Sequence, residues 1–188
     1  MFDFDKTWTL FLDRDGVINH RLVGTYVTNP DDFEFLEGSL EAINILSSIF
    51  GRVVVVTNQA GIGKGIMTET QLSLVHDKMF EQIRASGGRI DKAYHAPDLQ
   101  HEANDLRKPN SGMAHKAKFD FPEIDFDCSV MVGDSDSDIG FGNRLGMTTV
   151  FIEGKNEGED PSVNEPNFRF ESLIVFAKKV FEMDNTAL

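Results

Sequence analysis

The chain has 188 residues, 40% of them hydrophobic and 26% charged, a balance typical of one folded globular domain with a core of its own. A formal net charge of −13, with no run of lysines or arginines, argues against a nucleic-acid-binding protein. The N-terminus is acidic, no long apolar run occurs, and the single cysteine excludes an internal disulfide framework. We therefore expect a cytoplasmic protein without a membrane partner.

Short apolar segments alternate with amphipathic ones along the chain. The apolar segments predict strands at residues 7–12, 52–56, 93–95, 129–132 and 148–152, and the four valines at 53–56 are typical of a parallel strand buried on both faces. The amphipathic segments predict helices at residues 38–50, 68–86, 111–119, 137–145 and 171–183. Thr68 and Gln71 fit a capping box at the start of the second helix.

This alternation predicts an α/β fold, a doubly wound and mostly parallel sheet with helices on both faces, in a single domain spanning residues 1–188. The gaps between elements leave no room for a large cap domain. Residues 19–35 are the best candidate for a small flap over the site. Residues 153–166, rich in Gly, Glu, Asn and Pro, predict a surface loop before a last strand and helix.

The first predicted strand ends in two carboxylates, Asp13 and Asp15, followed by Gly16. Ligands of open parallel sheets bind beyond the carboxyl ends of the strands. Two neighbouring acids repel each other unless a cation lies between them, and Mg²⁺ prefers such oxygen ligands. Gly16 lets the backbone approach a ligand closely. Taken alone, the pair also fits a solvated acidic turn.

Each of the other three relevant strand ends also carries polar residues. The second is followed by a hydroxyl and two amides that suit a phosphate oxygen, although a plain glycine-rich turn explains that segment equally well. Two cations follow the third strand and its loop, and they fit either a phosphate clamp or a solvated pair. Two acids follow the fourth strand. They fit either a metal ligand with a supporting residue or acidic residues that stabilise the N-terminus of a helix through its dipole. In order, these residues are Thr57, Asn58 and Gln59, then Arg107 and Lys108, then Asp134 and Asp138.

The combination predicts phosphoryl transfer, because it supplies a nucleophile, an acid–base group, a phosphate clamp and a metal ligand. In this order the motifs resemble the haloacid dehalogenase superfamily, over about residues 7–153. The segments 11–19 (FLDRDGVIN), 55–62 (VVTNQAGI), 107–109 (RKP) and 131–134 (MVGD) are similar to the branch of heptose-bisphosphate and histidinol-phosphate phosphatases.

The resemblance implies a role for each residue. It makes Asp13 the nucleophile that becomes phosphorylated and Asp15 the acid and base, while Thr57 and Lys108 stabilise the phosphoryl group. Magnesium is bound by Asp13, Asp134 and the main-chain carbonyl of Asp15, with Gly16 and Asp138 in support. The residues implied to lie near the substrate, a small phosphate ester, are Asn19, Tyr26, Asn58, Gln59 and Arg107.

Two departures from this branch concern its substrate end. Many relatives carry a zinc loop that starts with Cys-Pro-His and ends with Cys-x-Cys before the Arg-Lys-Pro motif. Here those positions read Ala-Pro-Asp at 96–98 and Asn-Asp-Leu at 104–106, so no structural zinc is expected and His95 and His101 are interpreted as ordinary loop residues. Ser135 stands where bacterial heptose phosphatases often have lysine.

Three alternatives to a heptose or related sugar phosphatase stay open. A histidinol-phosphatase shares every catalytic motif, and only assays separate the two. A response-regulator receiver uses an acidic pair, a Thr and a Lys, but its acidic pair precedes the strand that carries the phosphorylated Asp. A non-catalytic phosphate-binding module is disfavoured by the intact motif set. A monomer is expected, and a dimer is left open.

Overall fold

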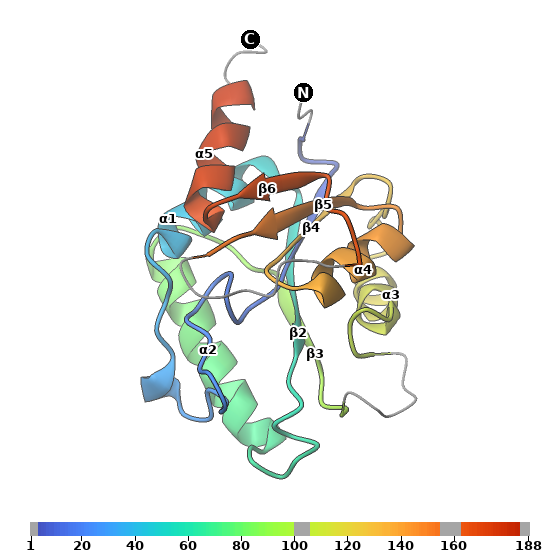
Figure 1. Ribbon diagram of the computed structural model, residues 1–188. Coiled ribbons are helices and arrows are strands. Elements are labelled where there is room, and N and C mark those ends of the chain that lie inside the picture. The colour runs from blue at the N-terminus through green and yellow to red at the C-terminus, as the bar shows by residue number, and fades with distance from the viewer. Residues whose placement is uncertain (1–3, 100–105, 155–162, 185–188) are drawn as a thin grey trace.

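The protein is described here from a computed structural model, which covers residues 4–99, 106–154 and 163–184. In these ranges the strands form one parallel sheet in the order β3-β2-β1-β4-β5-β6 (Figure 1). The strands are β1 (Thr9–Leu12), β2 (Arg52–Asn58), β3 (Lys92–Ala96), β4 (Ser129–Gly133), β5 (Thr148–Ile152) and β6 (Phe168–Phe170). The helices are α1 (Ser39–Ile49), α2 (Glu69–Ala85), α3 (Gly112–Asp120), α4 (Asp136–Arg144) and α5 (Leu173–Asp184), with a short 3-10 helix at Pro30–Asp32.

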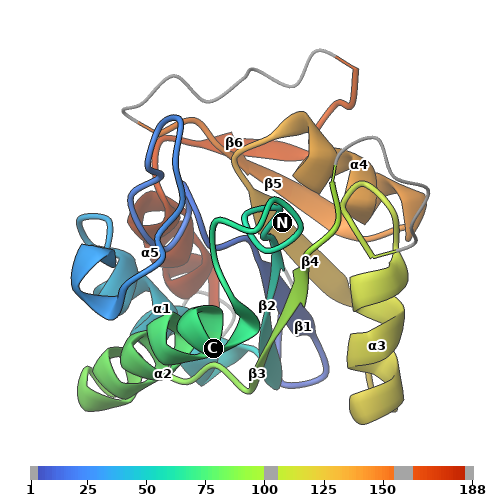
Figure 2. The same cartoon turned by 90° about the horizontal axis from the view of Figure 1, so that it is seen from below.

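Helices cover both faces of the sheet and bury an apolar core on each side. Figure 2 shows α1, α2 and α5 on one face and α3 and α4 on the other. The larger core joins Leu10, Val55 and Val132 of the strands to Ile43 of α1 and Phe176 of α5. The smaller core joins alternate strand residues to α3 and α4. The doubly wound arrangement predicted from the sequence is confirmed, and the burial of both faces explains why β2 has no polar alternation.

The local signals of the sequence also appear in the structure. The Thr68 hydroxyl accepts from the Gln71 backbone N–H, and the Gln71 side chain accepts from the Thr68 backbone N–H, so the predicted capping box starts α2. Gly87 follows this helix with a φ of 85°, the left-handed conformation that ends many helices. The interpretation of His95 as a loop residue is wrong, because it lies within β3, which extends through Ala96; the strand predicted at residues 93–95 is confirmed. His101 lies outside the described residues.

The predicted flap leaves the sheet directly after β1. Isolated bridges join Asn19 to both Asp15 and Phe35, so the segment between Asn19 and Phe35 starts and ends beside the first strand. Because all strands run parallel, the ends of β1, β2 and β4 that carry the polar motifs meet at one edge. The flap lies over this edge.

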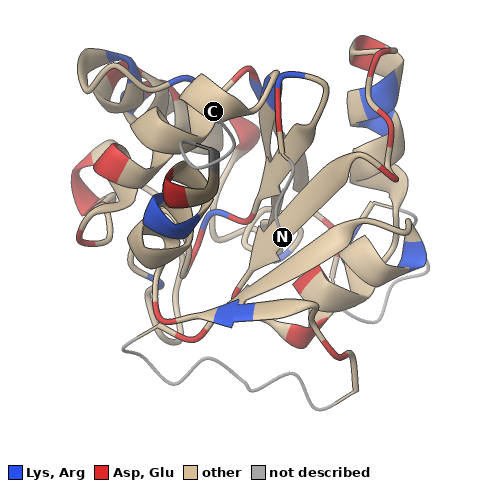
Figure 3. Ribbon diagram, turned by 90° about the horizontal axis from the view of Figure 1, so that it is seen from above, with Lys and Arg blue, Asp and Glu red and all other residues tan. Residues whose placement is uncertain are grey.

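Charged residues of both signs are distributed over the molecule. Figure 3 shows lysines and arginines mixed among the more numerous acidic positions, rather than gathered on one face of the described chain. In the same ranges no helix combines the length and the apolar character needed to cross a membrane.

Candidate active site

Asp13 and Lys108 form the centre of the site. Asp13 follows the last residue of β1, and Lys108 reaches it from the loop before α3, with 2.6 Å between Lys108 Nζ and Asp13 Oδ1. The same ammonium lies 2.6 Å from Asp138 Oδ1 and donates to the Val56 carbonyl at 2.7 Å. Lys108 is only 3% exposed, so all this charge is held away from water. Burial alone lowers the pKa of Lys108, but the two carboxylates raise it overall, and the side chain stays charged.

Three buried carboxylates meet at this point. Asp13, Asp134 and Asp138 each offer an oxygen, and these oxygens lie within 4.8 Å of one another. Burial is the largest cause that raises the pKa of Asp13 to about 6 and that of Asp134 to about 8; the neighbouring carboxylates act in the same direction, and Lys108 opposes them. Such an excess of buried negative charge is what a divalent cation relieves.

Gly16 allows this cluster to form. Its φ is 97°, and a Cβ built on it would lie 1.9 Å from Asp134 Oδ2. Asp138 supports the cluster from α4, because its Oδ2 accepts from the backbone N–H groups of Asp134 and Ser135 and from the Ser135 hydroxyl. Ser135 therefore fixes Asp138 at the start of the helix.

The Asp15 side chain is not part of the carboxylate cluster. Its two oxygens accept from Arg14 Nη2 at 2.8 and 2.9 Å, and each takes one further amide, Asn19 Nδ2 at 2.9 Å and Gln59 Nε2 at 2.8 Å. Burial raises the pKa of Asp15, but Arg14 and the two amides lower it more, and the net shift is downward. The side chain is therefore held as a carboxylate in a fixed orientation.

The residues after β2 orient their neighbours. The Gln59 amide also donates to Thr57 Oγ1 at 2.9 Å, and it is buried below the pocket surface. The Asn58 side chain forms two hydrogen bonds with the backbone of Lys108, accepting from its N–H at 3.0 Å and donating to its carbonyl at 3.2 Å. The side chains of Thr57 and Asn58 line the pocket. Gln59 and Asn19 are buried, and they support Asp15 from the side away from the pocket.

A pocket of about 420 Å³ opens above the carboxylates. The flap forms one wall with Arg21 and Tyr26, and the loop after β2 adds Lys64, whose ammonium lies 5.4 Å from the centre of the Tyr26 ring. Arg107, next to Lys108 in the chain, also lines the pocket. The pocket is therefore locally cationic in a strongly acidic protein, as binding of a phosphate ester requires.

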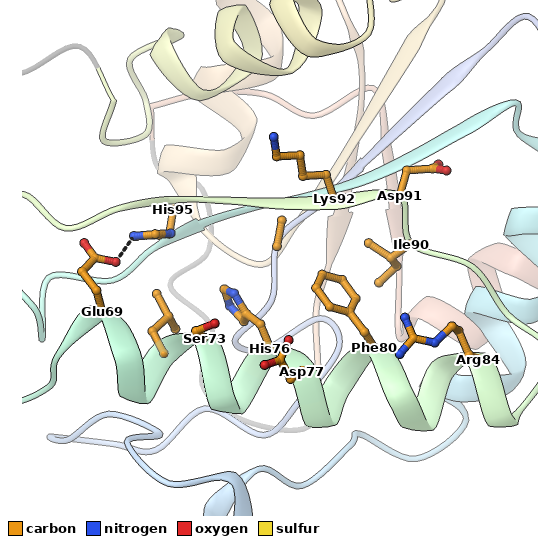
Figure 4. Close-up of a pocket in the computed structure, with 12 residues that line it drawn as sticks. Glu69, Ser73, His76, Asp77, Phe80, Arg84, Ile90, Asp91, Lys92 and His95 are labelled. Atoms are coloured by element: carbon orange, nitrogen blue, oxygen red, sulfur yellow. Dashed lines mark ion pairs between the residues drawn. The ribbon is translucent and has the colours of Figure 1, made fainter.

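A second groove, of about 460 Å³, lies between α2 and β3 (Figure 4). His95 pairs there with Glu69 at 2.8 Å, and His76 lies at its inner wall. His76 Nε2 is 3.4 Å from Arg14 Nη1, and burial followed by the Arg14 charge lowers the pKa of His76 to about 3. None of the three clustered carboxylates lines this groove, so the chemistry belongs to the first pocket.

Comparisons with known proteins agree with this geometry. The HAD-hydrolase-like family matches residues 105–174. D-glycero-alpha-D-manno-heptose-1,7-bisphosphate 7-phosphatase of Mycobacterium tuberculosis is 34% identical over 173 residues, which cover 92% of this chain and 91% of that protein. The chain belongs to the haloacid dehalogenase family of phosphatases. It is thus a phosphomonoester hydrolase, as the strand-end motifs indicated.

Two further haloacid dehalogenase phosphatases extend the comparison. The Campylobacter jejuni protein named D-glycero-alpha-D-manno-heptose-1,7-bisphosphate 7-phosphatase is 37% identical over 156 residues, 82% of this chain and 88% of that protein. The crystal structure of D,D-heptose 1,7-bisphosphate phosphatase from B. bronchiseptica, complexed with magnesium and phosphate, superposes with a TM-score of 0.84. It is 27% identical and covers 94% of this chain and 99% of that one.

Four residues of the site were not assigned by the sequence analysis. Arg14 gave a signal, since a cation between two strand-end acids has charge partners on both sides. Arg21 lies in the loop at 19–26, which was expected near the substrate, but it was not singled out. Lys64 and His76 gave no signal, because only the folded loop after β2 brings Lys64 to the pocket and only α2 brings His76 to Arg14. The family motifs mark the phosphate end of the pocket, and Arg21, Lys64 and His76 lie outside those motif segments.

Proposed function

We propose that this chain is a magnesium-dependent phosphatase that removes the 7-phosphate of D-glycero-D-manno-heptose 1,7-bisphosphate through an aspartyl-phosphate on Asp13. The observation that carries the proposal is the buried contact of Asp13 with Lys108 at the floor of a cationic pocket, in a chain whose relatives bear this enzyme name. The Asp13–Lys108 contact carries the chemistry of the proposal, and the relatives' names suggest the sugar.

The donor set fits magnesium. Asp13, Asp134 and the main-chain carbonyl of Asp15 are hard oxygen ligands, and burial, with the neighbouring carboxylates, raises the pKa of the two side chains, so a bound cation would stabilise their charged forms. When bound, magnesium supplies positive charge that screens the phosphate from the carboxylate that attacks it.

The side chains then divide the reaction between them. An Asp13 oxygen attacks phosphorus, a new O–P bond forms, and the bond from phosphorus to the sugar oxygen breaks. Lys108 and the Thr57 hydroxyl stabilise the charge on the transferred phosphoryl group. Asp15 gives a proton to the departing sugar oxygen and then takes one from the water that cleaves the aspartyl-phosphate.

The surroundings of Asp15 stabilise its charged form, which hinders both of its tasks. A carboxylate whose pKa is lowered by Arg14 accepts a proton from water only weakly and rarely carries one to donate. We infer that Asp15 turns away from Arg14 when the substrate binds, because loss of its two hydrogen bonds with Arg14 would raise the pKa of Asp15 and let it carry a proton to donate.

A turnover screen with magnesium tests the proposal. The substrates are D-glycero-D-manno-heptose 1,7-bisphosphate, other sugar bisphosphates and monophosphates, and histidinol phosphate, with Asp13→Asn as the control for contaminating phosphatase. We expect the heptose bisphosphate to give the highest kcat/KM and Asp13→Asn to lose turnover of every ester. A higher kcat/KM for histidinol phosphate would reject the sugar, and full activity of Asp13→Asn would reject the mechanism.

A further inference from the structure

The flap places a positive charge directly on the carboxylate cluster. Arg21 Nη2 donates to Asp134 Oδ1 at 2.8 Å and to the main-chain carbonyl of Asp15 at 3.3 Å. The Asp134 side chain is 9% exposed and the Arg21 side chain 45%, so the guanidinium enters the cluster from the solvent side. One nitrogen atom thus bridges a strand-end carboxylate and a backbone oxygen from another strand end.

These oxygens belong to two of the three groups proposed above as magnesium ligands, the Asp134 carboxylate and the main-chain carbonyl of Asp15. Mg²⁺ binds its oxygens at about 2.0–2.1 Å and demands near-octahedral geometry, so it does not share both of them with a guanidinium. Repulsion between a divalent ion and the Arg21 charge in a buried site acts in the same direction. Arg21 and the metal are therefore alternatives at this place.

Arg21 can leave without any rearrangement of the flap. Asn19, two residues earlier, is fully buried and bridged to both Asp15 and Phe35, which fixes the backbone at the base of the flap. The half-exposed Arg21 side chain needs only rotation about its own bonds. Its surroundings on the solvent side are the pocket walls, where Tyr26 and Lys64 lie.

We propose that Arg21 competes with magnesium for the oxygens of Asp134 and Asp15, and that metal binding transfers its guanidinium to the phosphate-binding pocket. This inference rests on the proposed metal site and extends it. In the second position Arg21 joins Lys64 and Arg107 and binds an oxygen of the anionic substrate. One side chain then neutralises the cluster before metal loading and holds the substrate afterwards.

The two positions make metal and anion binding mutually supportive. A metal ion frees the cation that the anion needs, and an anion that holds Arg21 removes the competitor of the metal. By linkage the two effects have the same size. Loss of Arg21 therefore strengthens metal binding and weakens anion binding, two opposite changes that a general loss of structure does not produce.

Magnesium titration calorimetry on chelator-stripped protein tests the competition. Arg21→Met keeps an unbranched side chain without the charge, and Lys64→Met removes one positive charge from the same pocket away from the carboxylates. At pH 8.5, where protons compete little with the metal, we expect Arg21→Met to lower the Kd for Mg²⁺ by about three- to thirtyfold, the range for a half-exposed charge-assisted hydrogen bond. Lys64→Met should change it by less than about twofold, since its charge is more distant and screened.

An unchanged or higher Kd in Arg21→Met overturns the competition, and so does an equal effect of Lys64→Met. A second titration uses inorganic phosphate as the probe. With saturating Mg²⁺, Arg21→Met should bind phosphate about five- to twentyfold more weakly than wild type, the scale of one lost charged partner. Without metal the difference should stay below about twofold, because Asp134 then holds Arg21. Equal weakening under both conditions overturns the transfer.

Neither titration involves turnover. An inactive protein that still shows both effects would leave Arg21 as described and reject the proposed function alone. A fully active phosphatase that shows neither effect would keep the proposed function and reject the role of Arg21.

Discussion

Replacing Lys108 by methionine removes the one ammonium that the buried carboxylates share. The change keeps the length of the side chain but leaves Asp13 Oδ1 and Asp138 Oδ1, each 2.6 Å from Nζ, without their positive partner. The Val56 carbonyl loses its donor at the same time. Taking one partner from a buried ion pair costs about 3–5 kcal/mol of folding stability, and the remaining carboxylates can recover part of this by binding protons.

The effect on catalysis has two parts. Loss of one preorganised charge next to the transferred phosphoryl group lowers kcat by about 100- to 1000-fold for every phosphate ester. In addition, Lys108 counteracts the effect of burial on the pKa of Asp13, which is about 6, so loss of Lys108 raises this pKa. Asp13 attacks only as a carboxylate, and the acid limb of the kcat/KM profile should therefore move to higher pH.

The assay is a pH–rate profile from pH 5 to 9.5 on one ester, with urea unfolding of each variant at pH 6 and 8.5. Lys64→Met is the control, since it removes a pocket charge that does not touch the carboxylates. A variant that is equally inactive at every pH, with an unmoved acid limb, would refute the electrostatic account of Lys108. An unchanged free energy of unfolding at pH 8.5 would show that Lys108 does not offset the repulsion among the three buried carboxylates.

Four further outcomes follow from the same geometry. Asp15→Asn should lower kcat by about 100- to 10,000-fold for poor leaving groups and much less for p-nitrophenyl phosphate, and equal losses for both would remove Asp15 as the acid. Arg107→Ala should change kcat/KM by amounts that differ between substrates, measured across the screen; a uniform loss would make it a second Lys108. Because burial raises the pKa of Asp13 to about 6 and of Asp134 to about 8, the native protein binds more protons than the unfolded chain between pH 4 and 8. The melting temperature of chelator-treated protein should therefore fall as pH rises through this window, and magnesium should reduce the fall; a melting temperature that rises instead contradicts it. Elemental analysis of protein purified without chelator should find no zinc, and one zinc per chain would contradict the interpretation of the loop at 96–106.

Much of the phosphate end of the site was predictable because its residues are tied to strand ends. Asp13 and Asp134 directly follow buried parallel strands and Thr57 is the penultimate residue of another, and parallel strands bring such ends together whatever the loops do. The order of the motifs added the roles. The fold followed from the same regularity, since an unbroken valine run and amphipathic segments between strands leave few other arrangements.

The rest depended on contacts that no local pattern encodes. Asn19 and Gln59 were expected to meet the substrate, but the structure turns both amides onto Asp15, because a buried carboxylate needs donors on all sides. Arg21 reaches Asp134 across 113 positions of the chain. Such a pairing depends on the conformation of the flap, and the sequence predicted only which residues form the flap, not how they fold.

The central claim is that Asp13 carries the phosphoryl group during turnover. Acid quenching during steady-state hydrolysis, followed by proteolysis at low pH and mass spectrometry, measures this directly. The account predicts a phosphoryl group on the peptide that contains Asp13, sensitive to hydroxylamine and missing from Asp13→Asn. A phosphoryl group on another residue, or turnover with none on Asp13 even when Asp15→Asn slows its hydrolysis, would contradict it.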